Sequence, residues 1–141
     1  MIRKLACLAA AALLALGCAK ATPETTGANA APLTELSVKE VADLVKTKSA
    51  TVVDANNADT RKEYGVVPGA VLLSSSKDFA LSELPAQKST KLVFYCGGTA
   101  CKASDKAAHR AASAGYADVS VMREGIRGWK SAGQPTSYPQ S

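Results

Sequence analysis

Apolar and polar residues form short blocks along the chain, and the spacing of the apolar positions changes several times. Compact apolar runs predict buried strands, whereas apolar positions three or four residues apart predict helices that bury one face. Ser37 precedes one such helix, because its hydroxyl can cap free amides while Glu40 reaches back to complete a capping box. The predicted strands are 51–54, 71–73, 91–95 and 119–122. The predicted helices are a first one from Ser37 to the polar residues 46–49, then 59–64, 104–114 and 126–131.

These blocks alternate, with short connections between them. The alternation predicts an α/β domain over residues 34–136, with a mostly parallel sheet flanked by helices on both faces. The run KLVFY, residues 91–95, is predicted to be the central strand. In such folds the reactive crevice lies beyond the carboxyl ends of the strands. Cys96 follows this strand directly and is therefore predicted to lie in the crevice.

The first twenty residues, MIRKLACLAAAALLALGCAK, have a different character. A basic start, an apolar middle and a small-residue exit are typical of an export signal, predicted here over residues 1–17. The cysteine at the exit resembles that of bacterial lipoproteins, which implies cleavage before Cys18 and lipid on its thiol. Ala19, rather than Asp, follows this cysteine, which resembles the pattern of lipoproteins that are sorted to the outer membrane. We therefore expect an exported protein, lipid-anchored in the cell envelope and facing the periplasm; a plain secretory signal or an uncleaved anchor is the alternative.

Residues 18–33 are small and polar, with Pro23, Gly27 and Pro32 among them, and cannot bury a core. They predict a flexible tether with a reach on the order of 20 Å. The domain beyond it is large enough for one core, and residues 137–141 form a short tail.

Charge and cysteine content narrow the functional classes. The formal net charge of +5 falls to about +3 once the signal, with its two basic residues, is removed, and no basic run is interleaved with aromatic residues. We therefore expect no nucleic-acid partner. Of the four cysteines, Cys7 leaves with the signal and Cys18 carries lipid, so the domain retains Cys96 and Cys101. An oxidising compartment permits disulfides, so this pair is either bonded or kept for chemistry.

The position of Cys96 favours a reactive thiolate. A cysteine between a buried strand and a helix faces the helix end that carries unpaired amides, and these donors lower the pKa of a thiol. Gly97 and Gly98 allow a tight turn that aims successive amides at the sulfur. Lys102 adds a nearby cation. We expect this sulfur to be ionised in a mouth open to solvent.

Four segments carry a resemblance to a known family: VVDANNADTRKEYGVVPGAVLL, LVFYCGGTACKAS, AAHRAASAGYADVSVM and EGIRGW. In order and spacing, residues 37–134 resemble the single-domain, rhodanese-like sulfurtransferases. The resemblance implies that Cys96 takes sulfane sulfur from a small donor, holds it as a persulfide and passes it to a thiol or a cyanide-like acceptor. It also implies a loop whose amides cradle the sulfur, formed by Gly97, Gly98, Thr99, Ala100 and Lys102.

The chain departs from the family pattern at several positions. Its loop is two residues longer than the usual one and lacks the arginine near the loop end, and Val66 stands where the family commonly has histidine. Without that arginine, an anion such as thiosulfate lacks a fixed bidentate partner. Related phosphatases have histidine and arginine where this chain has Tyr95 and Lys102, which argues against phosphatase activity.

Cys101 is the distinctive feature of the loop, and three hypotheses remain for it. Five residues around a tight turn can bring two α-carbons within disulfide range. In the first hypothesis, Cys101 resolves a persulfide or sulfenate on Cys96, giving a disulfide that a thiol reductant of the envelope must reduce. In the second, the two cysteines form a static disulfide that staples the loop. In the third, Cys101 is a bystander.

Other polar residues are predicted to surround the crevice. Asp54 ends a strand and is expected to bond loop amides, while Asn56 and Arg61 could touch a ligand. Cys96, Cys101 and His109 supply only three metal ligands at a spacing unusual for zinc, so no metal ion or other cofactor is expected. The functional classes left are sulfur transfer or thiol–disulfide exchange, an inactive binding module, and a structural lipoprotein.

Overall fold

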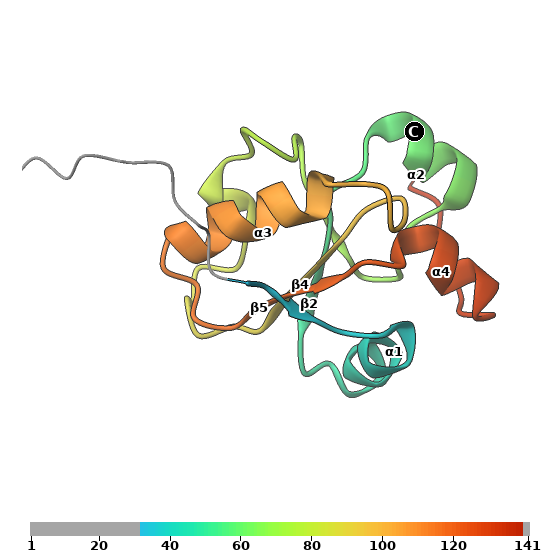
Figure 1. The fold of residues 1–141 in the computed structure, drawn as a ribbon, viewed down its shortest axis with the longest axis horizontal. Coiled ribbons are helices and arrows are strands. Elements are labelled where there is room, and N and C mark those ends of the chain that lie inside the picture. Colours follow the sequence, from blue (N-terminus) through green and yellow to red (C-terminus); the bar gives the residue numbers. More distant parts are fainter. Residues whose placement is uncertain (1–31, 140–141) are drawn as a thin grey trace, which may run out of the picture.

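The structure is a computed structural model that describes residues 32–139. Within this range the chain forms one sheet, four α-helices and one turn of 3-10 helix (Figure 1). The strands are β1 (Thr34–Glu35), β2 (Thr51–Asp54), β3 (Val71–Leu72), β4 (Leu92–Tyr95) and β5 (Val119–Met122). The helices are α1 (Val38–Thr47), α2 (Ala58–Tyr64), η1 (Leu81–Glu83), α3 (Ala103–Ser113) and α4 (Gly125–Ser131).

The strands pair in the order β1-β5-β4-β2-β3, and every pairing in this sheet is parallel. The prediction that the run at residues 91–95 is the central strand is confirmed, because β4 lies third of five with all four residues buried. Parallel pairing brings the carboxyl ends of β2, β4 and β5 to one edge of the sheet. Cys96 follows β4 at that edge.

Helices cover both faces of the sheet, which confirms the predicted α/β class (Figure 1). On one face, the alanines of α3 pack against Val53, Phe94 and Val121. Their small side chains let the helix lie close to the strands. On the other face, α1 and α4 enclose a second cluster that includes Tyr95 and Trp129. The two faces hold β4 rigidly, so the residue at its end has a fixed position.

Local signals account for the start of α1. The Ser37 hydroxyl accepts a hydrogen bond from the Glu40 amide, and the Glu40 carboxylate accepts one from the Ser37 amide at 2.8 Å. The predicted capping box is therefore confirmed. The Ser37 hydroxyl also donates to the Glu40 carboxylate, at 2.7 Å, and this bond contributes most to a lowered pKa of Glu40, followed by the bond from the Ser37 amide.

One strand was not predicted. β1 has two exposed residues, whose register on β5 pairs Thr34 with Ser120 and Glu35 with Val121. A polar edge strand of this length has no apolar pattern, so it could not be found from the sequence. η1 lies between Ser76 and Leu84, in a stretch that the sequence predicts as a loop or a short helix. The bounds of the other predicted elements agree with the observed ones within two residues, and the strands 51–54 and 119–122 match without a shift.

The predictions at the start of the chain fall largely outside the described residues. The signal 1–17, the lipidated Cys18 and nearly all of the tether 18–33 precede residue 32. They stay predictions. A search of residues 32–139 found no helix with the length and apolar character needed to cross a bilayer.

Candidate active site

An open cleft of about 900 Å³ lies at the carboxyl edge of the sheet, where the sequence predicted the reactive crevice. It is bounded by the loop after β4, the start of α2, the serines after β3 and the start of α4. The lining residues are Ala55, Asn56, Asn57, Thr60, Ser74, Ser75, Ser76, Gly97, Gly98, Thr99, Ala100, Cys101, Ala103, Glu124, Arg127 and Gly128.

Cys96 lies directly behind this cleft and forms a disulfide with Cys101. The residue is only 2% exposed, and its Sγ lies 3.3 Å from the hydroxyl of Ser104 in the first turn of α3. The expectation of a sulfur open to solvent is therefore wrong for the disulfide-bonded form. Cys101 is partly exposed and lines the cleft in its place.

The loop between Cys96 and α3 is anchored through its carbonyl groups. The carbonyl of Cys96 accepts a hydrogen bond from Ile126 at 2.8 Å, and that of Gly97 accepts one from Arg127 at 3.2 Å. The Gly98 carbonyl accepts one from the Cys101 amide at 2.9 Å.

The amides of residues 97–100 donate to no group within residues 32–139. Unpaired amides next to a helix start favour an anion such as a thiolate or a sulfur-borne negative charge. The loop therefore has the donor groups that the sequence led us to expect around Cys96.

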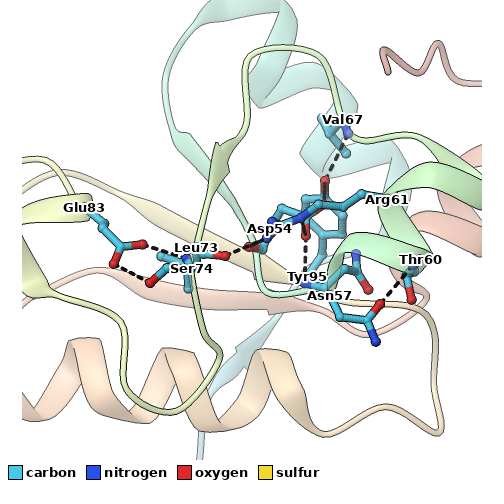
Figure 2. A network of polar contacts seen from close by, with 10 residues as sticks. Asp54, Asn57, Thr60, Arg61, Val67, Leu73, Ser74, Glu83 and Tyr95 are labelled. Carbon is cyan, nitrogen blue, oxygen red and sulfur yellow. Dashed lines mark hydrogen bonds and ion pairs between the residues drawn. The ribbon is translucent and has the colours of Figure 1, made fainter. Parts of the chain in front are cut away.

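A buried polar network lies at the carboxyl ends of β2 and β4, at the same edge of the sheet as Cys96 (Figure 2). The carboxylate of Asp54, fully buried, accepts hydrogen bonds from the Asn56 amide at 2.7 Å, Arg61 Nε at 3.1 Å and the Tyr95 hydroxyl at 2.5 Å. Arg61 Nη2 also donates to the carbonyls of Asp54 and Leu73. Arg61 and Asp54 thus tie β2 to β3 and to β4, and neither lines the cleft.

Burial raises the pKa of Tyr95 far above its usual range, and the charge of Asp54 raises it further. A raised pKa in the folded state means that Tyr95 contributes stability below pH 10, which is lost as the pH rises above that value. Between about pH 10 and 11, we expect the free energy of unfolding of the oxidised wild type to fall with pH more steeply than that of Tyr95→Phe. The two slopes should differ by up to about 1.4 kcal/mol per pH unit. Urea unfolding at each pH measures both slopes, and Tyr138→Phe, at an exposed position, is the control. Equal slopes for wild type and Tyr95→Phe would contradict the assignment.

Ser74, the first of the three serines that line the cleft, is held by the carboxylate of Glu83 (Figure 2). Glu83 accepts hydrogen bonds from the amide and hydroxyl of Ser74, at 2.8 and 2.7 Å, and from the Ala80 amide at 2.8 Å. These bonds lower the pKa of Glu83, the Ser74 amide contributing most. The wall formed by residues 74–76 is thus bonded to η1 and not left as a free loop.

Some of the predicted site residues line the cleft, and others do not. Asn56 is buried at the cleft wall, and its Nδ2 donates to no group within residues 32–139. The structure brings Asn56 together with Gly97, Gly98, Thr99, Ala100 and Cys101 along the cleft. Lys102 does not line it: its ammonium lies 3.8 Å from Asp105 on the exposed surface.

Sequence reasoning missed two residues of the site. Arg127, on α4, is the one arginine or lysine that lines the cleft among residues 32–139, and its guanidinium lies 4.9 Å from the ring centre of Tyr64. It forms no ion pair within that range. Ser104, beside Cys96, is the other. Arg127 belongs to the segment EGIRGW, and no local pattern in that segment indicates that its arginine lies near Cys96.

Comparison with known proteins agrees with this architecture. A family profile described as the rhodanese-like domain matches residues 37–132. A search of curated proteins found no significant match. A solved protein from Bacillus halodurans superposes with a TM-score of 0.65 at 23% identity, covering 74% of this chain and 77% of that one.

Two further structures have descriptive names. The rhodanese-like domain of an Anabaena protein superposes with a TM-score of 0.63 at 21% identity, covering 77% of this chain and 81% of that one. Thiosulfate sulfurtransferase from Pseudomonas aeruginosa superposes with a TM-score of 0.59 at 21% identity, covering 77% of this chain and 21% of that one. At these identities the structures show a shared fold, and the profile spans most of the chain. The chain therefore belongs to the rhodanese-like domain family.

Proposed function

We propose that this protein accepts sulfane sulfur on Cys96 and reduces it to sulfide with the help of Cys101. The observation that carries the proposal is the place of Cys96, at the end of the central strand and behind a cleft whose loop amides have no partner within residues 32–139. The neighbouring Cys101 is close enough to bond to it. The fold shared with a thiosulfate sulfurtransferase supports the same class of chemistry.

In the first step, the thiolate of reduced Cys96 attacks the sulfane sulfur of the donor. A new sulfur–sulfur bond forms, and the bond between that sulfur and the rest of the donor breaks. The remainder leaves with the electron pair, as sulfite does when the donor is thiosulfate. The product is a persulfide on Cys96, and its terminal sulfur is an anion that the amides of residues 97–100 can receive.

In the second step, the thiolate of Cys101 attacks Sγ of Cys96. The bond from that Sγ to the transferred sulfur breaks, the transferred sulfur takes up a proton from solvent and leaves as hydrosulfide, and the Cys96–Cys101 disulfide forms. The two cysteines have then supplied the two electrons that reduce sulfane sulfur to sulfide. A thiol reductant of the envelope must restore the dithiol. A thiol or a cyanide-like acceptor that reaches the persulfide first would take the sulfur without forming the disulfide.

The position of Arg127 favours a sulfur donor that carries a negative charge. The residue lines the cleft, with its guanidinium 4.9 Å from the ring centre of Tyr64, and carries no ion pair within the described chain. It therefore supplies from α4 the cation that the loop lacks at its own end. No cofactor enters the proposed steps, because the two cysteines supply both the nucleophile and the electrons.

We further propose that the domain acts outside the cytoplasm, held to a membrane by lipid on Cys18. This proposal is supported by the export-signal pattern of residues 1–17 and by the small, polar residues of the tether that follows. Labelled palmitate supplied to expressing cells should enter the wild type and not Cys18→Ser. Label of equal intensity in the two proteins would contradict this assignment.

A second candidate function is thiol–disulfide exchange with no sulfur donor, and the Cys96–Cys101 disulfide favours it. A single-turnover assay separates the two. Reduced wild type mixed with thiosulfate in the absence of other thiols should release about one sulfide per chain and lose both thiols. Cys101→Ser should lose one thiol and release no sulfide until an external thiol is added. Unchanged thiols with no sulfide, across thiosulfate and organic persulfide donors, would leave exchange or an inactive binding module.

A further inference from the structure

The two cysteines of the disulfide differ in their exposure to solvent. Cys96 is 2% exposed, does not line the cleft, and is surrounded by β4, α3 and the loop. Cys101 is partly exposed and lines the cleft, next to the exposed residues Thr99 and Ala100. A nucleophile that enters through the cleft therefore meets the sulfur of Cys101 first.

We propose that thiol reductants attack Sγ of Cys101 and that Cys96 leaves as the thiolate. This assignment rests on the proposed function in one respect, because it describes how the disulfide left by sulfur transfer is reduced to the dithiol again. It gives the two cysteines opposite roles in the two halves of the cycle. Cys96 receives sulfur from the donor, whereas Cys101 receives the electrons that restore the dithiol.

The reset has two exchange steps. The reductant thiolate bonds to Sγ of Cys101 while the bond between the two cysteines breaks, and the electron pair stays on Cys96. A second reductant thiol, deprotonated, then attacks the reductant's sulfur in the mixed disulfide, and Cys101 leaves as a thiolate that takes up a proton. Two reductant thiols are thereby oxidised to one disulfide, and the protein pair is reduced.

The surroundings of Cys96 suit a leaving thiolate. Exchange is faster when the leaving thiol has a lower pKa. The Ser104 hydroxyl, itself buried, lies 3.3 Å from Sγ of Cys96 and can donate to the thiolate as it forms. The start of α3 and the unpaired loop amides favour the same charge. Ser104 is thus a positioning residue that acts through the leaving sulfur.

The entrance to Cys101 suits an anionic nucleophile. Thr99 and Ala100, exposed next to Cys101, are small and uncharged, so they present neither a bulky nor a negatively charged side chain to an incoming thiolate. Arg127 lines the same cleft, and its positive charge attracts an incoming thiolate. Glu124, the one acidic residue that lines it, lies at the start of α4.

The experiment uses oxidised wild type, a short exposure to glutathione, and an acid quench with an alkylating agent, with no sulfur donor present. Trypsin releases both cysteines in the peptide 92–102, and fragment ions between them locate each group. The expected species has glutathione on Cys101 and the alkyl group on Cys96. Glutathione on Cys96, or a disulfide left intact by an excess of glutathione, overturns the proposal.

A second measurement tests the role of Ser104. Ser104→Ala should reduce the rate of this reduction roughly tenfold, as expected for loss of a hydrogen bond to a charged sulfur. Ser120→Ala, which removes an equally buried hydroxyl within β5, is the control. The thiolate absorbance of Cys96 in the Cys101→Ser background should also titrate at higher pH when Ser104 is replaced. Equal rates and an unmoved titration would overturn the role of Ser104.

The two proposals fail separately. If sulfur transfer is absent but glutathione still bonds to Cys101, the order of attack holds and the donor chemistry is wrong. If sulfide is released but glutathione bonds to Cys96, the proposed function holds and the route of reduction is wrong.

Discussion

Cys96→Ser is expected to abolish sulfide release from thiosulfate, with a loss on the order of 1,000-fold or more. A serine hydroxyl at this position stays protonated near neutral pH, so it cannot attack sulfane sulfur as a thiolate does. Serine is close to cysteine in volume and can still contact Ser104, so the fold should be retained. Steady-state sulfide production with excess dithiothreitol measures the loss.

Cys101→Ser is the matched control for that variant. It removes a thiol from the same loop but leaves Cys96 to accept sulfur, and an external thiol can then release sulfide. Its rate with excess dithiothreitol should stay within about tenfold of wild type. Turnover by Cys96→Ser that equals this control would contradict the role of Cys96.

Gly125→Ala is expected to destabilise the protein by about 2–4 kcal/mol. Gly125 has a φ of +61° and lies where α4 meets the active-site loop. A methyl group there would fall 2.4 Å from the carbonyl oxygen of Cys96, 2.6 Å from the Gly98 amide nitrogen and 2.7 Å from the Gly97 carbonyl carbon. All three are backbone atoms, so the loop itself must shift, and the amides around Cys96 shift with it.

Gly133→Ala separates collision from backbone strain. Gly133 has a similar φ of +70°, but no atom lies within 4 Å of the position its methyl group would take. It should therefore cost only about 1 kcal/mol. Urea unfolding of the two variants compares their free energies of unfolding. A cost for Gly125→Ala no greater than that for Gly133→Ala would show that the loop is not clamped by α4.

Local patterns predicted most of the fold. The cap at Ser37, the buried run at residues 91–95 and the alanines of α3 each have a physical signal that acts within a few residues. Alternation of these blocks was enough to predict a parallel sheet with two covered faces. β1 was missed because its two exposed residues are held by pairing with β5, a contact far away in the sequence.

The site was predictable only along its own segment. The loop after Cys96 is continuous in sequence, so its glycines and Cys101 could be assigned to it. Arg127 reaches the cleft from α4, and only the packing of α4 against the loop places it there.

Exposure of the sulfur was not predictable either. A thiol after the central strand was expected to face solvent, but in the disulfide-bonded structure Cys96 is buried and bonded to Cys101. Sequence spacing allowed that bond and could not decide whether it forms. Lys102 illustrates the same limit, because its pairing with Asp105 depends on how α3 begins.

The central claim is that Sγ of Cys96 is the atom that takes up sulfur. Mass spectrometry of the peptide 92–102 from reduced Cys101→Ser tests this claim most directly. After exposure to thiosulfate or an organic persulfide, followed by alkylation, the account predicts one added sulfur atom on Cys96, with the alkyl group beyond it. Cys96 recovered with the alkyl group alone after every donor would contradict the account.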